Sequence, residues 1–371
     1  MKQAMKQAML IVTLGLASCA SAPQAEATPG SPSPAAAVVA ASPTVPAEPE
    51  HPRTWAEVPK FYDQTCPGPL FTLEEPHEFD AGGSRWRIEG STLKRLGGPW
   101  KGKLVIGVLG AVKDAEPDTK KNLQKAKKAF SKAKVNLIVL NGDVAESAEI
   151  NDVSKMLAEI FIDVPVLVHA GNVEWMSSFS EAFFTLQAKQ PNFFNGNVLR
   201  DVDLGGVHIL TLPGWSNRRF VKQGGCHYSA EHVAELDKLA AEIHGRGELV
   251  ILSAHGPPRG EGKKALDYAF DVGNVGDEAL AALLHKGTVR FGLFSHILEA
   301  GGRATADPKK HKPLPKPMFT MRKSLFINAG SASSFSWLMH SGARSRGMAA
   351  IVTVDAIAQG GKAKVAFLKL R

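Results

Sequence analysis

Residues 137–146 read LIVLNGDVAE, and the interpretation of the whole chain starts from this stretch. Four consecutive apolar residues followed by Asn141, Gly142 and Asp143 predict a buried parallel strand that ends in a tight turn and places a carboxylate at its carboxyl end. Ligands bind at that edge of open α/β sheets. A strand followed by Gly-Asp is common, so the prediction of a site depends on what other strand ends supply.

Three later apolar runs end in the same way, each followed by a side chain that can bind a metal. They are residues 166–170 before Asn172, residues 251–254 before His255, and residues 291–294 before His296. Oxygen donors together with imidazole nitrogens suit a hard or borderline divalent cation. The strand ends therefore predict a metal site, although each side chain taken singly is also typical of a turn cap or a packed, hydrogen-bonded position.

The order of the apolar patterns indicates the fold class. Alternating strands and helices are predicted from residue 103 to residue 294, with helices near residues 119–132, 149–161, 178–188, 230–244 and 276–284. Residues 324–327, 348–354 and 363–368 then have the pattern of strands with little helix between them. This order predicts an α/β (α+β) fold in which two packed sheets lie between helices.

The composition is that of an ordinary globular protein, with 44% hydrophobic and 22% charged residues and a formal net charge of +8 over 371 residues. Seven lysines lie within residues 119–134, where Leu123, Ala126 and Phe130 recur at helical spacing, so we assign them to the solvated face of a helix. Nucleic-acid binding would need aromatic platforms or a known reading module beside the basic residues. The sequence shows neither, and no nucleic-acid partner is predicted.

Residues 1–18 predict a lipoprotein signal peptide, because Lys2 and Lys6 precede an apolar run that is too short for a permanent membrane helix. Residues 16–19, Leu-Ala-Ser-Cys, resemble the bacterial lipobox, which implies lipidation of Cys19 and a membrane anchor of acyl chains. Ala20 in place of an aspartate implies the outer membrane of a Gram-negative cell, facing the periplasm or the surface. The alternative is a plain cleaved signal.

The rest of the chain divides into three predicted segments. Residues 19–53 are rich in Pro and Ala and predict a semi-extended tether. Residues 54–100 predict an N-terminal β extension, and residues 101–371 predict the main domain. Cys66 lies in the extension and Cys226 in the main domain, and an exported protein can bridge such a pair. The sequence leaves a disulfide and two free thiols equally open.

From about residue 103 onward the chain resembles the calcineurin-like metallophosphoesterase superfamily. The resemblance depends on a series of ordered motifs: Gly142-Asp143, Gly171-Asn172, His255, the half-kept last motif at His296, and a closing turn at residues 328–331. It implies a four-layer αββα sandwich of two mixed sheets flanked by helices. It also implies a pair of divalent metals and the hydrolysis of phosphoesters.

The departures from the family pattern fall mostly on one of the two metal sites. Gly110 and Val112 stand where the first motif has aspartate and histidine, and Leu298 stands where the last motif has its second histidine. The other site keeps its whole ligand set: Asp143, Asn172, His255 and His296. Val173 replaces the histidine that assists protonation of the leaving group. We therefore predict at most one divalent metal ion, Mn, Fe or Zn, and possible loss of metal altogether.

Two functions follow from this pattern. In the first, a reduced mononuclear site hydrolyses a phosphoester substrate, Asp143, Asn172 and His255 act through the metal, and Arg259 pairs with a phosphate oxygen. In the second, the chain is a catalytically inactive binding or scaffold protein at the cell envelope that keeps the fold for its surface. The intact ligand set favours the first, and the depleted motifs favour the second.

Other polar residues near the motifs have weaker interpretations. Asp114 and Glu174 lie close in sequence to the lost positions and are candidate substitutes as ligand or acid. His169, His208 and His340 fall outside the motifs, and we predict structural roles for them.

Overall fold

The computed structural model describes residues 51–315, 319–356 and 360–371. The predicted signal peptide, Cys19 and all of the predicted tether before residue 51 lie outside the described residues. Within the described part of the chain, no helix combines the length and the apolar character that crossing a bilayer requires.

The smaller of the two main sheets has six strands, in the order β19-β18-β4-β5-β6-β7. Their bounds are β4 (Lys103–Leu109), β5 (Leu137–Asn141), β6 (Val166–His169), β7 (Phe193–Asn195), β18 (Met348–Asp355) and β19 (Lys362–Lys369). Strands β4 to β7 are parallel, and β18 and β19 add an antiparallel edge. The carboxyl ends of β5 and β6 therefore point to the same side.

The larger sheet has nine strands, in the order β1-β2-β3-β8-β9-β10-β13-β15-β14. Their bounds are β1 (His77–Ala81), β2 (Ser84–Ile88), β3 (Thr92–Arg95), β8 (Asp201–Asp203), β9 (Val207–Leu212), β10 (Leu249–Ala254), β13 (Phe291–Phe294), β14 (Arg303–Thr305) and β15 (Leu325–Asn328). Strands β9, β10, β13 and β15 are parallel, while both edges contain antiparallel pairs. Both sheets are thus mixed.

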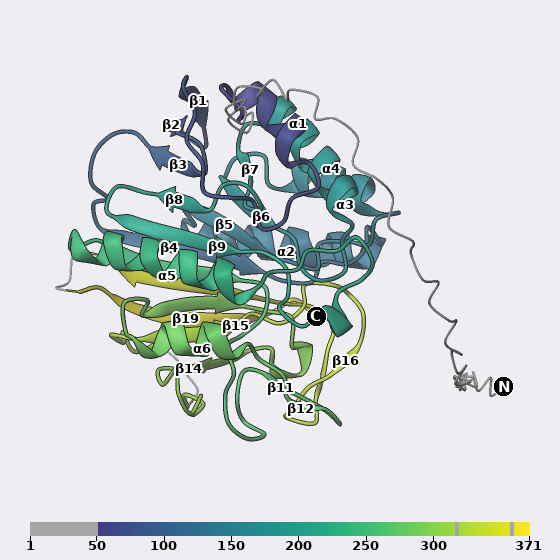
Figure 1. The fold of residues 1–371 in the computed structure, drawn as a ribbon. Coiled ribbons are helices and arrows are strands. Elements are labelled where there is room, and N and C mark those ends of the chain that lie inside the picture. Colours follow the sequence, from purple (N-terminus) through teal and green to yellow (C-terminus); the bar gives the residue numbers. More distant parts are fainter. Residues whose placement is uncertain (1–50, 316–318, 357–359) are drawn as a thin grey trace, which may run out of the picture. The chain divides into compact units, whose positions relative to one another are not determined.

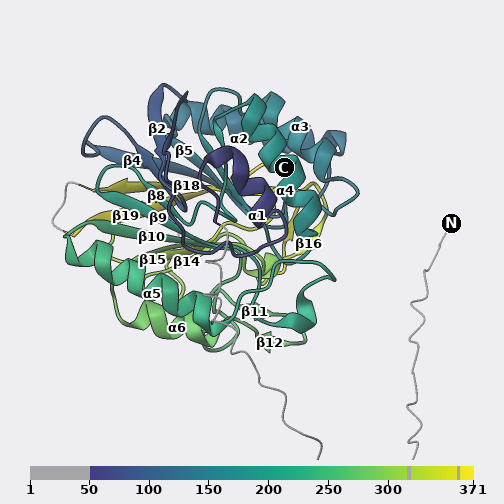
Figure 2. The same cartoon turned by 45° about the horizontal axis from the view of Figure 1, so that its top comes forward.

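Helices cover the outer faces of the two sheets. The smaller sheet is covered by α2 (Pro117–Ala133), α3 (Ile150–Ile160) and α4 (Met176–Lys189), and the larger by α5 (Ala230–Gly245) and α6 (Glu278–His285). Figure 1 shows the ribbon, and Figure 2 shows the two groups of helices on opposite sides of the stacked sheets. The predicted four-layer αββα arrangement is confirmed.

The apolar run of β5 has a simple explanation in this arrangement. Leu137 and Val139 belong to the core between the two sheets, whereas Ile138 and Leu140 belong to the core between the smaller sheet and its helices. Successive side chains of a strand point to opposite faces. A strand covered on both faces therefore needs four consecutive apolar residues, and each of the four is at most 1% exposed.

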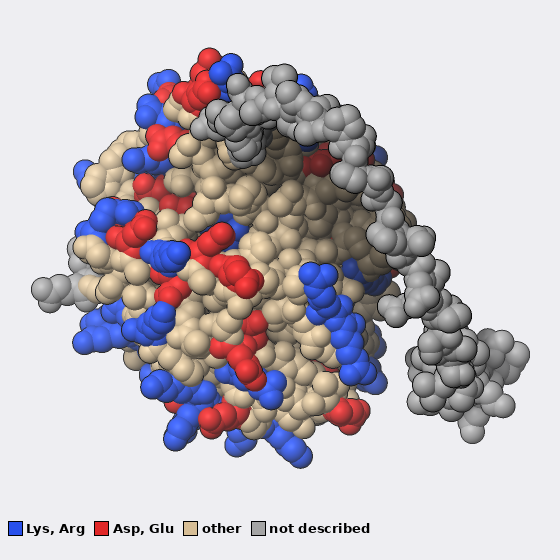
Figure 3. Space-filling model, viewed as in Figure 1, with Lys and Arg blue, Asp and Glu red and all other residues tan. Residues whose placement is uncertain are grey.

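The lysine-rich helix is α2, which begins at Pro117. Its residues Leu123, Ala126 and Phe130 are buried against the smaller sheet, and its lysines are exposed or half-buried. This is the pattern of an amphipathic helix that lies on a sheet. Figure 3 shows that basic and acidic side chains are mixed over the face that it draws, including the surface of α5.

Residues 54–100 contribute a short helical segment and three strands. A short 3₁₀ turn η1 (Trp55–Glu57) and helix α1 (Val58–Tyr62) come first, and strands β1 to β3 follow. β3 pairs in parallel with β8, so these strands continue the larger sheet. Residues 71–75 (FTLEE), which have a strand-like pattern, form no strand.

Short elements complete the described chain. They are the hairpin strands β11 (Tyr268–Ala269) and β12 (Gly273–Asn274), the hairpin strands β16 (Trp337–Leu338) and β17 (Arg344–Ser345), and the 3₁₀ turns η2 (Arg218–Phe220) and η3 (Leu298–Ala300).

Candidate metal centre

Four side chains from the two sheets meet at the carboxyl ends of parallel strands. Asp143 follows β5 and Asn172 follows β6 in the smaller sheet, while His255 follows β10 and His296 follows β13 in the larger sheet. In parallel sheets this edge collects the residues that follow each strand. The structure thus brings together all four residues that the sequence suggests as metal ligands.

His255 Nε2 lies at the centre of this group. It is 2.9 Å from Asn172 Oδ1, 3.1 Å from His296 Nδ1 and 3.2 Å from Asp143 Oδ1. Two ligands that share one metal at about 2.1 Å, at angles of roughly 90 to 110°, lie ~3.0 to 3.4 Å apart. The spacing of the donor atoms therefore fits a single divalent ion.

The hydrogen bonds around the group leave electron pairs directed inward. His255 Nδ1 is 3.0 Å from the carbonyl oxygen of Asn141, which is an acceptor, so Nδ1 carries the proton and Nε2 presents a lone pair. Asn172 donates its Nδ2 to the carbonyl of Phe220 at 2.7 Å, which turns Oδ1 toward His255. Asp143 Oδ1 is buried without a hydrogen-bond partner. Closely spaced acceptors of this kind are stabilised by a cation between them.

Burial and neighbouring charges shift the pKa values of Asp143, His255 and His296 in different directions. Burial alone would raise the pKa of Asp143, but His255, Lys113 and His296 lower it well below its usual range. Burial opposes the charged form of His255, yet Asp143 and the Asn141 carbonyl raise its pKa. Burial and the charge of His255 lower the pKa of His296 to about 3. Asp143 thus favours a proton on His255 when no cation is bound, and a metal ion that binds the charged carboxylate and the neutral imidazoles takes the place of the proton on His255 Nε2.

The backbone at the site adopts left-handed conformations that side chains disfavour. Asp143 has φ 53° and His296 has φ 47°, and nearby Ala111 and Lys113 have φ 46° and 70°. Such conformations persist where the surrounding structure fixes them, and they concentrate at functional sites. Among the described residues, seven non-glycine residues have positive φ, and four of them are Asp143 itself and three residues near it in the site.

Glu174 connects the two loops that carry Asp143 and Asn172. Its carboxylate accepts a short hydrogen bond from the backbone N–H of Val144 and a second one, of 2.8 Å, from the N–H of Gly171. Burial and the charge of Asp143 raise the pKa of Glu174 to about 7. Both oxygens are thus occupied by the backbone, and Glu174 positions the two loops instead of substituting for a lost ligand.

Lys113 approaches Asp143 from the side opposite to His255. Its Nζ lies 3.4 Å from Asp143 Oδ2, while Asp143 Oδ1 faces His255. The side chain of Lys113 is 30% exposed and that of Asp143 is 6% exposed. One carboxylate therefore lies between the group of metal ligands and an ammonium group.

The positions at which the family resemblance predicts further metal ligands, residues 110, 112 and 298, hold no donor side chain. A Cβ added at Gly110 would lie 2.4 Å from Ser295 Cβ and 2.8 Å from the carbonyl oxygen of Gly330. Val112 and Leu298 are buried apolar residues, and Val173 is half-buried. The space that an aspartate at position 110 would need is thus filled by Ser295, whose hydroxyl donates to the Asn141 carbonyl at 2.7 Å.

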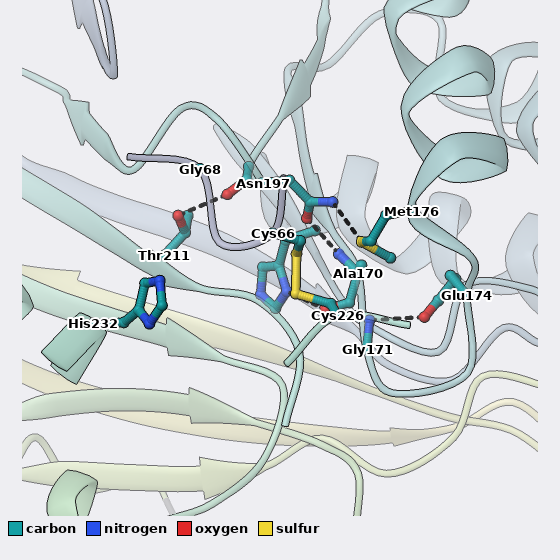
Figure 4. The surroundings of a disulfide bond; sticks show 12 residues. Cys66, Gly68, Ala170, Gly171, Glu174, Met176, Asn197, Thr211, Cys226 and His232 are labelled. Carbon is teal, nitrogen blue, oxygen red and sulfur yellow. Dashed lines mark hydrogen bonds between the residues drawn. A yellow bond between two sulfur atoms is a disulfide. The ribbon is translucent and has the colours of Figure 1, made fainter. Parts of the chain in front are cut away.

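Cys66 and Cys226 form a disulfide, with Cα atoms 5.2 Å apart and a sequence separation of 160 residues. The disulfide lies beside the segment of Ala170 and Gly171, as Figure 4 shows. The loop that contains Cys226 also holds Asn172, because Lys222 donates its N–H to the Asn172 carbonyl at 2.9 Å. The disulfide therefore fixes the loop that orients one of the metal ligands.

Two other candidate residues lie outside the ligand group. Arg259 lines a cavity of about 430 Å³ together with Arg219 and Phe220. Asp114 accepts hydrogen bonds from Ser333 Oγ at 2.9 Å and from the N–H of Glu116 at 3.0 Å. Asp114 thus connects its own loop to the closing turn and has no ligand role.

The histidines outside the motifs have structural partners. His169 Nε2 is 2.9 Å from Ser253 Oγ, and His340 Nε2 is 2.6 Å from the carbonyl of Tyr268. His208 Nδ1 is 2.9 Å from the Asp201 carboxylate. Burial opposes the charge of His208, but the hydrogen bond to Asp201 raises its pKa.

Comparison with known proteins agrees with this geometry. Residues 108–299, slightly more than half of the chain, match the family model of calcineurin-like phosphoesterases. The chain therefore belongs to the calcineurin-like phosphoesterase family. Members of this family use divalent metals, and Asp143, His255 and His296 form a group in this chain that can hold one.

One curated relative is a probable cyclic nucleotide phosphodiesterase of Fibrobacter succinogenes, which is 28% identical over 162 residues, 43% of this chain. The chain spans 57% of the length of that relative. Similar solved structures include TT1561 of Thermus thermophilus, with 13% identity and a TM-score of 0.44 over 72% of this chain and 99% of that one. A dimetal phosphatase from Danio rerio has 13% identity and a TM-score of 0.44 over 73% of this chain and 100% of that one.

Sequence reasoning missed Lys113 and assigned Glu174 the wrong role. Lys113 lies next to the first lost motif, and a positive charge beside vacated ligand positions was the available signal. Glu174 is recognisable as an acid, but its role as a connection between two loops depends on backbone N–H groups that the sequence does not place. Both act on Asp143 or its loop.

Proposed function

We propose that this chain is a metal-dependent phosphoester hydrolase that works with one divalent metal ion, Mn, Fe or Zn. The observation that carries the proposal is the convergence of four donor atoms from four strand ends, in which three of the atoms lie within 3.2 Å of the fourth, His255 Nε2. The proposed ligands are Asp143, Asn172, His255 and His296. A divalent ion there would supply Lewis acidity toward a phosphoryl oxygen and lower the pKa of water.

The protein residues determine how the ion and the substrate are held. Asn141 and Phe220 orient His255 and Asn172 through backbone carbonyls, and Glu174 fixes the spacing of the two loops. Val173 offers no proton to a leaving group, and removing a general acid typically costs ~10² to 10⁴ in rate. Substrates whose leaving groups need no protonation should therefore react fastest, and p-nitrophenyl phosphoesters should exceed alkyl esters.

The choice of substrates to test has two sources. The name of the Fibrobacter relative makes cyclic nucleotides the first natural substrates to screen. Arg259 and Arg219, in the cavity next to the loop that holds Asn172, are proposed to pair with anionic groups of a bound substrate. Charge-assisted bonds from arginine to phosphate are the expected interaction.

The alternative proposal is a catalytically inactive binding or scaffold protein at the cell envelope. The observation in its favour is the closed space at Gly110, together with Val173, since both remove parts of the catalytic machinery of the family. We further propose that Cys19 is lipidated and holds the protein at the outer membrane. Mass spectrometry of the mature N-terminus, beside a Cys19→Ala variant that should be released from membranes, tests the anchor.

Metal content distinguishes the two functions. Protein purified without chelator should contain about one metal ion per chain by elemental mass spectrometry, and a His255→Ala/His296→Ala double variant should contain none. His169→Ala is a matched control, because His169 is a buried histidine outside the ligand group. Absence of bound metal, and of thermal stabilisation by added Mn, Fe or Zn, would leave the inactive binding protein as the better account.

A further inference from the structure

The carboxylate of Asp143 faces two different cationic positions. Its Oδ1 atom faces the proposed metal ligands, at 3.2 Å from His255 Nε2. Its Oδ2 atom lies 3.4 Å from Lys113 Nζ. Among the described residues, Asp143 is the one hydrogen-bond partner of this ammonium group, which has three N–H donors. Lys113 therefore retains donors for another ligand.

The backbone fixes Lys113 in this place. The N–H of Ala111 donates to the Gly142 carbonyl at 3.0 Å, and the N–H of Lys113 donates to the Val144 carbonyl at 2.8 Å. These two bonds lie on either side of Asp143 and hold the two loops in register. With the left-handed φ of 70° at Lys113, the bonds direct its side chain along the carboxylate. The contact is thus built into the loop and does not depend on a freely moving surface lysine.

The side of Asp143 next to Lys113 contains no further metal ligand among the described residues. Ser295 fills the space beside Gly110, and Val112 is a fully buried apolar residue. The side chain of Lys113 is 30% exposed, so an anion from solvent can reach the ammonium group. An anion that bound there would also lie beside the Asp143 carboxylate, which repels it, so a second positive charge at the ligand group is needed for tight binding.

We propose that Lys113 binds a phosphoryl oxygen of the substrate, so that the phosphoryl group is held between a lysine ammonium and one metal ion. This inference depends on the proposed function, because it assumes that a metal occupies the ligand group. Lys113 then supplies, as a fixed organic cation, a positive group beside the metal ion. It also explains how a single metal can suffice to bind a dianionic phosphoryl group.

The test uses inorganic phosphate and the full chain loaded with Mn. Isothermal titration calorimetry measures phosphate affinity for wild type, Lys113→Met and Lys113→Arg, and elemental analysis measures Mn per chain in each. Loss of one charge-assisted hydrogen bond weakens binding by roughly 10- to 100-fold. We expect that loss in Lys113→Met, a smaller change in Lys113→Arg, and about one Mn in all three proteins. Lys120→Met is the matched control, since Lys120 is an ion-paired lysine on α2.

The outcomes separate the two proposals. Phosphate affinity that is equal in Lys113→Met and wild type, at one Mn per chain, overturns the role of Lys113 and leaves the one-metal site intact. A change in Mn content with unchanged phosphate affinity shows that Lys113 only neutralises Asp143, and it also overturns the inference. Wild type without Mn overturns the proposed function as well. Thermal unfolding of each variant establishes that it is folded.

Discussion

Replacement of Glu174 by alanine should destabilise the protein and weaken its metal binding together. The substitution leaves the backbone N–H groups of Val144 and Gly171 buried without an acceptor. Each unsatisfied group costs about 1 to 3 kcal/mol, so the expected loss in the free energy of unfolding is roughly 2 to 6 kcal/mol. Removal of a carboxylate beside Asp143 also relieves repulsion, which places the expected value in the lower half of that range.

Urea unfolding of the metal-free protein, followed by tryptophan fluorescence, measures this loss. Glu174→Gln keeps the size of the side chain and one acceptor oxygen, so it should lose about half as much. Glu181→Ala is a matched control, because Glu181 is an exposed residue on α4 and should stay within about 0.5 kcal/mol of wild type. An alanine variant at position 174 that is as stable as this control, with unchanged Mn affinity, would refute the reasoning.

Three further predictions concern stability. Removal of the disulfide by Cys66→Ala/Cys226→Ala should lower the free energy of unfolding by about 5 kcal/mol, from the chain-entropy estimate for a loop of 160 residues, and should also weaken Mn binding. Chemical denaturation of wild type and the double variant at equal Mn concentration measures the loss in stability, and equal stability contradicts the prediction. Gly110→Asp should lower the unfolding temperature without adding a second metal ion, and a further Ser295→Gly substitution in the same chain should restore part of the loss. A Gly110→Asp variant with the unfolding temperature of wild type would contradict the clash. Against the effect of burial, the hydrogen bond and charge of Asp201 raise the pKa of folded His208, so the contribution of His208 to stability is complete below the ordinary histidine pKa of about 6.5 and is lost as the pH rises through the folded value. The difference in unfolding temperature between wild type and His208→Gln should therefore shrink as the pH is raised above about 6.5. A difference that does not change with pH argues against the ion pair.

The parts of the fold that sequence predicts are those in which one strand or helix carries a complete pattern. β5 and α2 are examples, because a strand covered on both faces needs a continuous apolar run and an amphipathic helix needs spaced apolar residues. β1, β3 and β8 escaped prediction. Each is at most five residues long and depends on its neighbours in the larger sheet, and pairing partners distant in sequence leave no local pattern.

The ligand group was predictable for a different reason. Asp143, Asn172, His255 and His296 each lie within three residues of the carboxyl end of an apolar strand, so the topology of parallel strands places them at one edge. Lys113 lies four residues beyond the end of β4, within the loop before α2, and its position depends on two backbone hydrogen bonds and a left-handed φ. Hydrogen bonds between loops distant in sequence are the part of a site that residue types and spacing do not reveal.

The contact between Gly110 and Ser295 also bears on how such a site can change over time. An aspartate side chain at position 110 and the serine side chain at position 295 compete for one volume, with a Cβ-to-Cβ separation of 2.4 Å. A lineage that acquired an aspartate at position 110 first would pass through a strained protein. Replacement of Ser295 by glycine would have to come first, with no immediate benefit to metal binding. The packing of one serine thus opposes the addition of an aspartate ligand at position 110 by a single mutation.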